Sequence, residues 1–270
     1  SSIDDDSIIK NMTIQNGNGG ILIDGSSPTI DSCKIIDNIA ISEVGGGIKI
    51  VGAGQTVVDP TISNSIIISN QSVGGESISG GGAGIYITTG ATPVISNNLI
   101  AFNSATIGSA KGSGIMCYYA SPSLENNTIY GNTSWVYSDG DSSSIAGGIY
   151  LLGNSNPTID KTIVWGNSNG ALIVEPQSNP TVTYSNIEGS YSDVDLANNG
   201  SNINSNPLFC DIGNLDFSLA DNSPCSLGTL EFIGAYNTGG CGDIVLDCNG
   251  VPGGTALEDE CGECVDGDTG

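Results

Sequence analysis

The chain has 270 residues, of which 40 are glycine, and its 29 acidic residues against five basic ones give a formal charge of −24. With 38 % hydrophobic residues it can bury a core, so the acidity does not indicate a disordered chain. A surface this acidic repels nucleic acid and anionic lipid, and no apolar run is long enough to cross a bilayer, so we expect neither a nucleic-acid partner nor membrane insertion.

A stretch of eleven residues that starts with proline recurs six times along the chain. Each copy has aliphatic residues two and seven places after the proline, and the first five copies end in asparagine. Such spacings, with many β-branched residues, favour strands over a helix. Residues 1–18 look like a partial first coil. The full copies are PTIDSCKIIDN (28–38), PTISNSIIISN (60–70), PVISNNLIAFN (93–103), PSLENNTIYGN (122–132), PTIDKTIVWGN (157–167) and PTVTYSNIEGS (180–190).

A second strand, usually led by glycine, follows the partial coil and each asparagine-ended copy after a polar loop of variable length. These strands are Gly-Ile-Leu-Ile (20–23), Gly-Ile-Lys-Ile (47–50), Gly-Ile-Tyr-Ile (84–87), Gly-Ile-Met-Cys (114–117), Gly-Ile-Tyr-Leu (148–151) and Ala-Leu-Ile-Val (171–174). Alternation along the strands predicts one buried face, made of Ile23, Ile50, Ile87, Cys117, Leu151 and Val174. Because consecutive prolines lie 23 to 35 residues apart and the loops absorb nearly all of this variation, the pattern predicts a β-solenoid.

The asparagines that end the first five copies predict an internal ladder. Buried side-chain amides at equivalent turns can bond to their copies in the coils above and below, which leaves no amide group unpaired. The ladder residues are Asn38, Asn70, Asn103, Asn132 and Asn167. On this repeat, the chain resembles the right-handed parallel β-helix proteins of secreted bacterial origin, which have a pectate-lyase-like solenoid fold. The resemblance covers roughly residues 1–235 and implies an all-β, right-handed parallel β-helix of about seven to eight coils.

The stretch NPLFCDIGNLDFSLADNSPC (206–225) looks like the segment that closes such helices. We therefore assign residues 1–235 to the helix, with 206–235 as its closing segment. The same resemblance implies a disulfide between Cys210 and Cys225. Cys33 and Cys117 belong to different coils and different faces, so we expect both to be unpaired.

Residues 236–270 form a short acidic tail, similar to Cys-Gly-Asp-rich modules at the ends of secreted proteins. Its four cysteines are Cys241, Cys248, Cys261 and Cys264. Four cysteines allow three pairings, and the sequence does not choose between them. A structural zinc site is the alternative, but the resemblance places the chain outside the cell, where disulfides are the expected state. We therefore expect a secreted or cell-surface protein with a disulfide-rich tail.

Calcium is the expected cofactor, because carboxylate and carbonyl oxygens are the ligands that this chain offers. Eight carboxylates within residues 241–270 would repel one another if they were compacted without a cation. For any single cluster, a solvated acidic surface is the alternative interpretation. The calcium candidates are Asp243, Asp247, Asn249, Asp259, Glu260, Glu263, Asp266 and Asp268 in the tail, with Asp4, Asp5 and Asp6 at the other end.

The resemblance also brings pectate lyases, alginate lyases and polygalacturonases into consideration. These enzymes use arginine or lysine as a base beside a cation, or aspartates together with histidine and arginine. This chain contains no histidine and no arginine, and of its five lysines only Lys49 lies on the expected outward face of the glycine-led strands. A polyanionic substrate would also be repelled by the acidic surface. We therefore expect no catalysis, and a lyase or hydrolase is the least favoured function.

The outward face of the glycine-led strands carries an apolar and aromatic stripe: Leu22, Lys49, Tyr86, Met116, Tyr118, Tyr150, Leu152 and Ile173. An ordinary, partly exposed strand face is the simpler interpretation for any one of these residues. As a stripe on a rigid rod, the face suits lateral protein packing or stacking on neutral sugars. The candidate glycan-binding residues are Tyr86, Tyr118, Tyr150 and Trp135.

Two functions follow from these patterns. The first is a non-catalytic extracellular structural protein, a subunit of a calcium-stabilised surface fibre or adhesin that assembles end to end with copies of itself. The second is a carbohydrate-binding β-helix module of a larger secreted protein, which uses the tyrosines for a neutral glycan.

Overall fold

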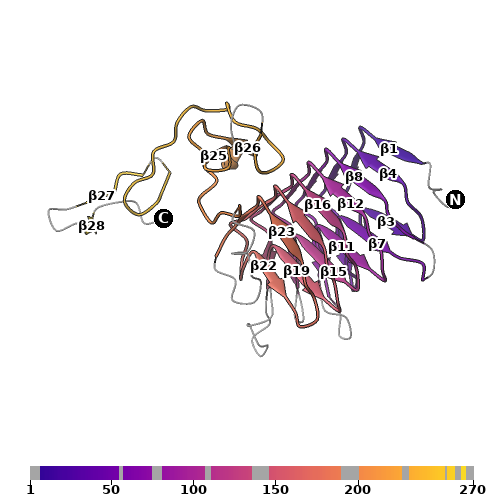
Figure 1. The fold of residues 1–270 in the computed structure, drawn as a ribbon. Helices are drawn as coiled ribbons and strands as arrows, with labels where there is room; N and C mark the ends of the chain where they lie inside the picture. The colour runs from indigo at the N-terminus through magenta and orange to yellow at the C-terminus, as the bar shows by residue number, and fades with distance from the viewer. Residues whose placement is uncertain are drawn as a thin grey trace. The chain divides into compact units, whose positions relative to one another are not determined.

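The computed structural model describes residues 7–54, 57–74, 81–106, 111–135, 146–189, 201–226, 231–252, 254–258 and 263–265. The chain divides into two compact units, one of residues 1–205 with 233–235 and one of residues 206–232 with 236–270. The sequence-based assignment placed 206–235 with the helix, whereas here residues 206–232 belong with the C-terminal residues. The first unit is built of repeated coils, and equivalent strands of successive coils lie side by side in parallel sheets (Figure 1).

Two seven-stranded parallel sheets are built from the proline-led repeats. The first, called the proline sheet, contains β1 (Ile8–Lys10), β4 (Thr29–Asp31), β8 (Thr61–Ser63), β12 (Val94–Ser96), β16 (Ser123–Glu125), β20 (Thr158–Asp160) and β23 (Thr181–Thr183). The second, called the ladder sheet, contains β2 (Thr13–Gln15), β5 (Lys34–Ile36), β9 (Ile66–Ile68), β13 (Leu99–Ala101), β17 (Thr128–Tyr130), β21 (Ile163–Trp165) and β24 (Asn186–Ile187). The predicted parallel β-helix is therefore confirmed, with seven stacked coils in the described residues.

The glycine-led strands form a third parallel sheet, called the glycine sheet. It contains β3 (Ile21–Asp24), β7 (Ile48–Val51), β11 (Ile85–Thr88), β15 (Ile115–Tyr118), β19 (Ile149–Leu152) and β22 (Leu172–Val174). A fourth, short sheet begins directly after the ladder asparagines, where the sequence predicted only loop. It contains β6 (Ile39–Ile41), β10 (Gln71–Val73), β14 (Ser104–Thr106) and β18 (Thr133–Ser134). Its inward residues are small, which is why no aliphatic periodicity announced it: Ala40, Ser72, Ala105 and Ser134.

The core consists of aliphatic stacks that run through the coils. Equivalent strands pair in matching register, so that Ile30 lies against Ile62, and Ile62 against Ile95. These side chains are fully buried. Of the six residues predicted on the buried face of the glycine sheet, five are buried and Val174, in the last strand, is partly buried. Burying one isoleucine stabilises a fold by about 1.5–3 kcal/mol. Each interior coil buries several such side chains at the same places, so the interior coils contribute similar amounts to stability.

The predicted asparagine ladder is confirmed. The Asn70 side-chain amide donates to the Asn103 Oδ1 at 3.0 Å, and the Asn103 amide donates to the Asn132 Oδ1 at 2.9 Å. Each amide also donates to a strand carbonyl of the preceding coil, as Asn103 does to the Ile67 oxygen at 3.0 Å. Asn38 and Asn167 extend the same pattern at the two ends. The side chains of all five are buried.

A second polar stack occupies the turn between the proline and ladder sheets. There, a side-chain oxygen in each coil accepts a hydrogen bond from a backbone N–H of the preceding coil. Ser65 accepts from Cys33 at 3.0 Å, and Asn98 accepts from Ser65 at 2.9 Å. The stack continues through Asn127, Thr162 and Ser185. The residue types vary along this stack, so the sequence did not indicate a ladder.

The C-terminal unit has a different construction. Strands β25 (Phe209–Asp211) and β26 (Asp216–Leu219) pair antiparallel around the 3-10 helix η3 (Ile212–Asn214). The Phe209 and Phe217 rings meet edge to face with centroids 5.1 Å apart. A short antiparallel pair, β27 (Leu257–Glu258) and β28 (Cys264–Val265), lies further along the chain.

The disulfides differ from the expected pairing. Cys210 bonds to Cys241, and Cys248 bonds to Cys264, so the predicted bridge between Cys210 and Cys225 is wrong. Cys225 is fully buried instead. The backbone N–H of Leu219 in β26 donates to the Asn237 backbone oxygen, and Leu219 also forms a parallel bridge with Thr238. Cys241 follows three residues later and bonds to Cys210 of β25.

Of the remaining cysteines, Cys261 lies outside the described residues. Cys33 and Cys117 are free thiols buried in the solenoid, as predicted.

Candidate functional site

The outward face of the glycine sheet carries two parallel rows of side chains. Register between the strands puts equivalent residues of successive coils side by side. The first row is Leu22, Lys49, Tyr86, Met116, Tyr150 and Ile173. The second row is Asp24, Val51, Thr88, Tyr118 and Leu152. The stripe predicted from strand alternation is therefore present.

A wall along the first row is formed by the chain segments that enter the glycine-led strands. Gly45 and Gly82 have left-handed φ values of 77° and 53°, which let their backbones lie directly on the sheet. A Cβ at Gly45 would lie 2.8 Å from the Cβ of Lys49, and one at Gly82 would lie 2.7 Å from the Cβ of Tyr86. The Gly45 N–H also donates to the Gly81 oxygen at 3.2 Å, which ties the wall of one coil to the next.

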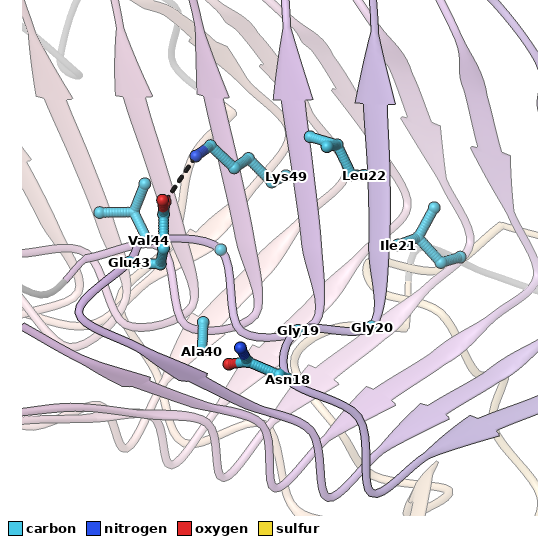
Figure 2. Close-up of a pocket in the computed structure, with 10 residues that line it drawn as sticks. Asn18, Gly19, Gly20, Ile21, Leu22, Ala40, Glu43, Val44 and Lys49 are labelled. Carbon is cyan, nitrogen blue, oxygen red and sulfur yellow. Dashed lines mark hydrogen bonds and ion pairs between the residues drawn. The ribbon is translucent and has the colours of Figure 1, made fainter. Parts of the chain in front are cut away.

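Two hollows follow this wall. The larger has a volume of about 570 Å³ and is lined by Glu43, Val44, Lys49, Val51, Tyr86, Thr88, Met116, Tyr118 and Leu152. The smaller, about 280 Å³, lies over the first two coils and is lined by Asn18, Gly19, Gly20, Ile21, Leu22, Ala40, Glu43, Val44, Gly45 and Lys49 (Figure 2). Glu43, Val44 and Lys49 line both hollows, so the two hollows meet at these residues. We call the combined feature the groove.

An ion pair marks the place where the two hollows meet. Lys49 extends from β7, and the Glu43 carboxylate points toward it from the segment before that strand (Figure 2). The Lys49 Nζ lies 2.7 Å from the Glu43 Oε2, with 27 % of the lysine and 55 % of the glutamate side chain exposed. The hydrogen bond from Lys49 lowers the pKa of Glu43, so this carboxyl group is ionised at neutral pH.

The floor of the larger hollow is apolar and aromatic. Tyr86 is half-buried, and its burial raises the pKa of the phenol, which keeps the hydroxyl group neutral. Tyr118, on the next strand, is 38 % exposed, and its ring centroid lies 4.7 Å from that of Tyr119. Met116 and Leu152 are partly buried beside these rings. Two tyrosines with accessible area and two flexible aliphatic side chains thus form one continuous surface.

Tyr150, which the sequence placed on the same binding face, is not accessible. The Lys111 ammonium lies 4.7 Å from its ring centroid and 2.8 Å from its hydroxyl oxygen, and the hydroxyl donates to the Glu175 carboxylate. Its side chain is fully buried, and burial together with Glu175 raises the pKa of Tyr150. The contact of Lys111 with Tyr150 was not predictable from strand alternation, because this lysine lies in the segment before β15 and not in a strand.

Trp135 also lies away from the groove. It follows β18 on the short sheet, where its N–H donates to the Ala105 oxygen at 3.1 Å, and its side chain is 63 % exposed. Of the four aromatic residues chosen from the sequence, the structure brings only Tyr86 and Tyr118 together in the groove.

The described calcium candidates are Asp243, Asp247, Asn249 and Glu263, and they do not converge. Within the described residues, no three acidic, cysteine or histidine side chains are arranged to hold a metal ion. The Asp247 carboxylate accepts backbone N–H groups from Asn249, Val251 and Ala256 at 2.8–3.2 Å, so it organises its own loop. Asp4, Asp5, Asp6, Asp259, Glu260, Asp266 and Asp268 lie outside the described residues, and calcium binding stays a prediction.

Two structural findings bear on the protein's environment. Two disulfides indicate a compartment outside the reducing cytosol. Among the described residues, no helix has the length and apolar character needed to cross a membrane.

Comparison with known proteins addresses the fold. A comparison with curated proteins and one with solved structures each return no significant match. The family model for the right-handed β-helix region matches residues 1–107 and 61–214, which cover most of the chain and all four parallel sheets. The chain therefore belongs to the right-handed β-helix family.

Proposed function

We propose that this protein is a non-catalytic extracellular β-helix that binds a neutral carbohydrate chain in the groove of the glycine sheet. The observation that carries the proposal is the hollow of about 570 Å³ floored by Tyr86, Met116 and Tyr118. Sugar rings present apolar C–H faces that stack on tyrosine, while the phenol hydroxyls and a few polar groups fix the orientation.

The charges around the groove support a neutral ligand. The chain carries a formal charge of −24, so an acidic polysaccharide approaches against repulsion. Lys49 is the one basic side chain among the described residues that line the groove, and Glu43 neutralises it. The same pairing gives no support to cleavage, because the one basic side chain that lines the groove is already hydrogen-bonded to a carboxylate.

The test is calorimetric titration of the protein with neutral hexasaccharides: cello-, xylo-, manno-, malto- and laminari-hexaose. We expect at least one of them to bind, and Tyr118→Ala to weaken that binding about tenfold, the effect of one lost stacking contact. Trp135→Ala is the matched control, since it removes an exposed aromatic side chain from the short sheet and should leave the affinity unchanged. The proposal fails if no hexaose binds or if Trp135→Ala is the more harmful change.

A fibre or adhesin subunit is the second candidate, and the first coil favours it. Strands β1, β2 and β3 are the edge strands of their sheets in the described structure. The core residues Ile9 and Ile14 are only partly buried there, while their equivalents in the next coil, Ile30 and Ile35, are fully buried. A second copy that stacks on this coil would pair the strand edges and cover the two side chains.

Sedimentation velocity over a range of concentrations tests this second function, with calcium or EDTA in parallel. Assembly that grows with concentration and weakens with EDTA would support a calcium-stabilised fibre. A single monomer species in both buffers would remove it.

A further inference from the structure

The two hollows make one groove that is longer than a single sugar. Its lining extends from Leu22 on β3 to Leu152 on β19, which spans five neighbouring strands of the glycine sheet. Four steps of about 4.8 Å between strands give a length of roughly 19 Å along the solenoid axis. A ligand that fills this length is an extended chain that lies across the strands. The ion pair between Lys49 and Glu43 then falls in the interior of the site and not at an end.

We propose that Lys49 and Glu43 together select an uncharged oligosaccharide with two neighbouring free hydroxyl groups on an interior sugar. This inference rests on the function proposed above and assigns the specificity of the same groove to these two side chains. It separates two tasks within the groove. The tyrosines stack on sugar rings whatever the identity of the sugar. The ion pair forms hydrogen bonds only with a sugar whose hydroxyl groups are suitably placed.

The geometry of the pair supports this role. One of the three Lys49 ammonium hydrogens is used by Glu43, and the carboxylate retains further acceptor sites. The two charged groups lie 2.7 Å apart, one hydrogen-bond length, and neighbouring hydroxyls on a sugar ring have a similar separation. One hydroxyl can therefore accept from the ammonium while the other donates to the carboxylate.

The same pair excludes charged ligands. A sugar carboxylate beside Lys49 would also face the Glu43 carboxylate, and an amino sugar that approaches Glu43 would face the Lys49 ammonium. Either ligand would replace a satisfied ion pair with one favourable and one repulsive contact. Hydrogen bonds to charged groups are stronger than those between neutral groups, so a neutral diol gains from both partners without breaking the pair.

The pair is also held in position by the fold. Lys49 lies on β7, an inner strand of the glycine sheet, between Leu22 of β3 and Tyr86 of β11. Glu43 belongs to the segment whose Gly45 packs on the Lys49 Cβ, and the Ser72 hydroxyl donates to its backbone oxygen at 2.9 Å. Both side chains therefore start from fixed backbone, and their charged groups point toward each other (Figure 2).

The experiment uses the cello-, xylo-, manno- or malto-hexaose that binds the wild-type protein, since the interior sugars of these four carry neighbouring free hydroxyls at C2 and C3, together with its partly O-methylated form, in which these hydroxyls are blocked. Lys49→Met and Glu43→Gln should each lower the affinity for the native hexaose by at least tenfold. The affinity of the wild-type protein should also be at least tenfold lower for the methylated hexaose than for the native one. Each of the two variants should bind the native and the methylated hexaose with nearly equal affinity. Lys34→Met, a lysine exposed on the ladder sheet, is the matched control and should change nothing.

A charge exchange separates recognition from simple disruption. The double variant Glu43→Lys with Lys49→Glu restores an ion pair in reverse order and should recover part of the binding, because a diol donates and accepts from either side. A thermal melt of each variant confirms that the solenoid is folded. If Tyr118→Ala weakens binding about tenfold while Lys49→Met and Glu43→Gln bind as well as the wild type, the selective role of the pair is wrong and the proposed function stands. If no hexaose binds the wild type, both fall together.

Discussion

The two units of this protein reach a stable structure by opposite means. In the solenoid, each coil makes the same contacts with the next: backbone hydrogen bonds between strands, packing of aliphatic side chains and the bonds of the polar ladder. Each coil therefore adds a similar amount to the free energy of unfolding. In the C-terminal unit, few side chains are buried around Phe209 and Phe217, and two disulfides close its chain. The two cysteines of the solenoid, Cys33 and Cys117, are buried as free thiols.

The contrast shows where the sensitivity of each unit lies. A repeat structure tolerates variation in its loops but not in the positions that every coil shares, because one faulty coil interrupts all stacks at once. A small unit with little core depends on cross-links that restrict its unfolded chain. Substitutions at a ladder position and at a cysteine should therefore affect different units, and the following predictions test this separation.

The largest effect is expected for Asn103→Ala. The Asn103 side chain makes buried hydrogen bonds to the Asn70 backbone N–H, the Asn70 amide, the Ile67 oxygen and the Asn132 amide oxygen. Their loss leaves several buried polar groups without partners, at a cost of roughly 5 kcal/mol in the free energy of unfolding of the solenoid. Chemical denaturation followed by circular dichroism measures this cost.

Asn156→Ala is the matched control for that substitution. Asn156 also bonds to the next coil, by accepting from the Asn179 N–H at 2.7 Å, but its side chain is exposed to water. We expect a loss of about 1 kcal/mol or less. Equal losses at Asn103 and Asn156 would contradict the view that burial makes the ladder important.

The second prediction concerns the bridge between Cys210 and Cys241, which are separated by 31 residues. On the chain-entropy model, its removal by Cys210→Ser with Cys241→Ser costs the C-terminal unit about 4 kcal/mol. Hydrogen exchange should rise throughout β25 and β26 but stay unchanged in the glycine sheet. The double variant Cys33→Ala with Cys117→Ala controls for loss of cysteine. If the first variant speeds exchange in the solenoid to the same degree, the two units do not have separate stabilities.

The smallest effect is a dependence on acid. Hydrogen bonds from Asn64 and Lys10 lower the pKa of Asp31 below its ordinary value. A carboxyl group whose pKa is lower when folded stabilises the fold above its unfolded pKa, about 3.9, and this contribution is lost as the pH falls through the folded pKa. The melting temperature of Asp31→Asn should therefore fall less steeply than that of the wild type below about pH 4.

The sequence predicted those parts of the structure that repeat. Ile30, Ile62 and Asn103 could be assigned to stacks because several coils place the same residue type at the same offset. The short sheet escaped because its inward residues, such as Ala40 and Ser72, are too small to produce an apolar period. Contacts made once were not predictable either. Cys241 lies against Cys210 because the chain before it pairs with β26, and Lys111 packs on Tyr150 from a loop. Each of these contacts occurs once, so it produces no repeated pattern in the sequence.

The asparagine ladder has one further consequence. From Asn38 to Asn132, each side-chain amide donates to the asparagine Oδ1 of the next coil. Each interior coil therefore presents the same bonding groups to its two neighbours as any other interior coil does. A duplication of whole coils is therefore compatible with the fold, whereas an insertion of half a coil is not. Repeating residues 60–92 would add one strand to the glycine sheet and lengthen the groove by about 4.8 Å. Duplication of whole coils, by evolution or by design, can thus change the length of the groove in steps of one strand spacing, with no new interior contacts required.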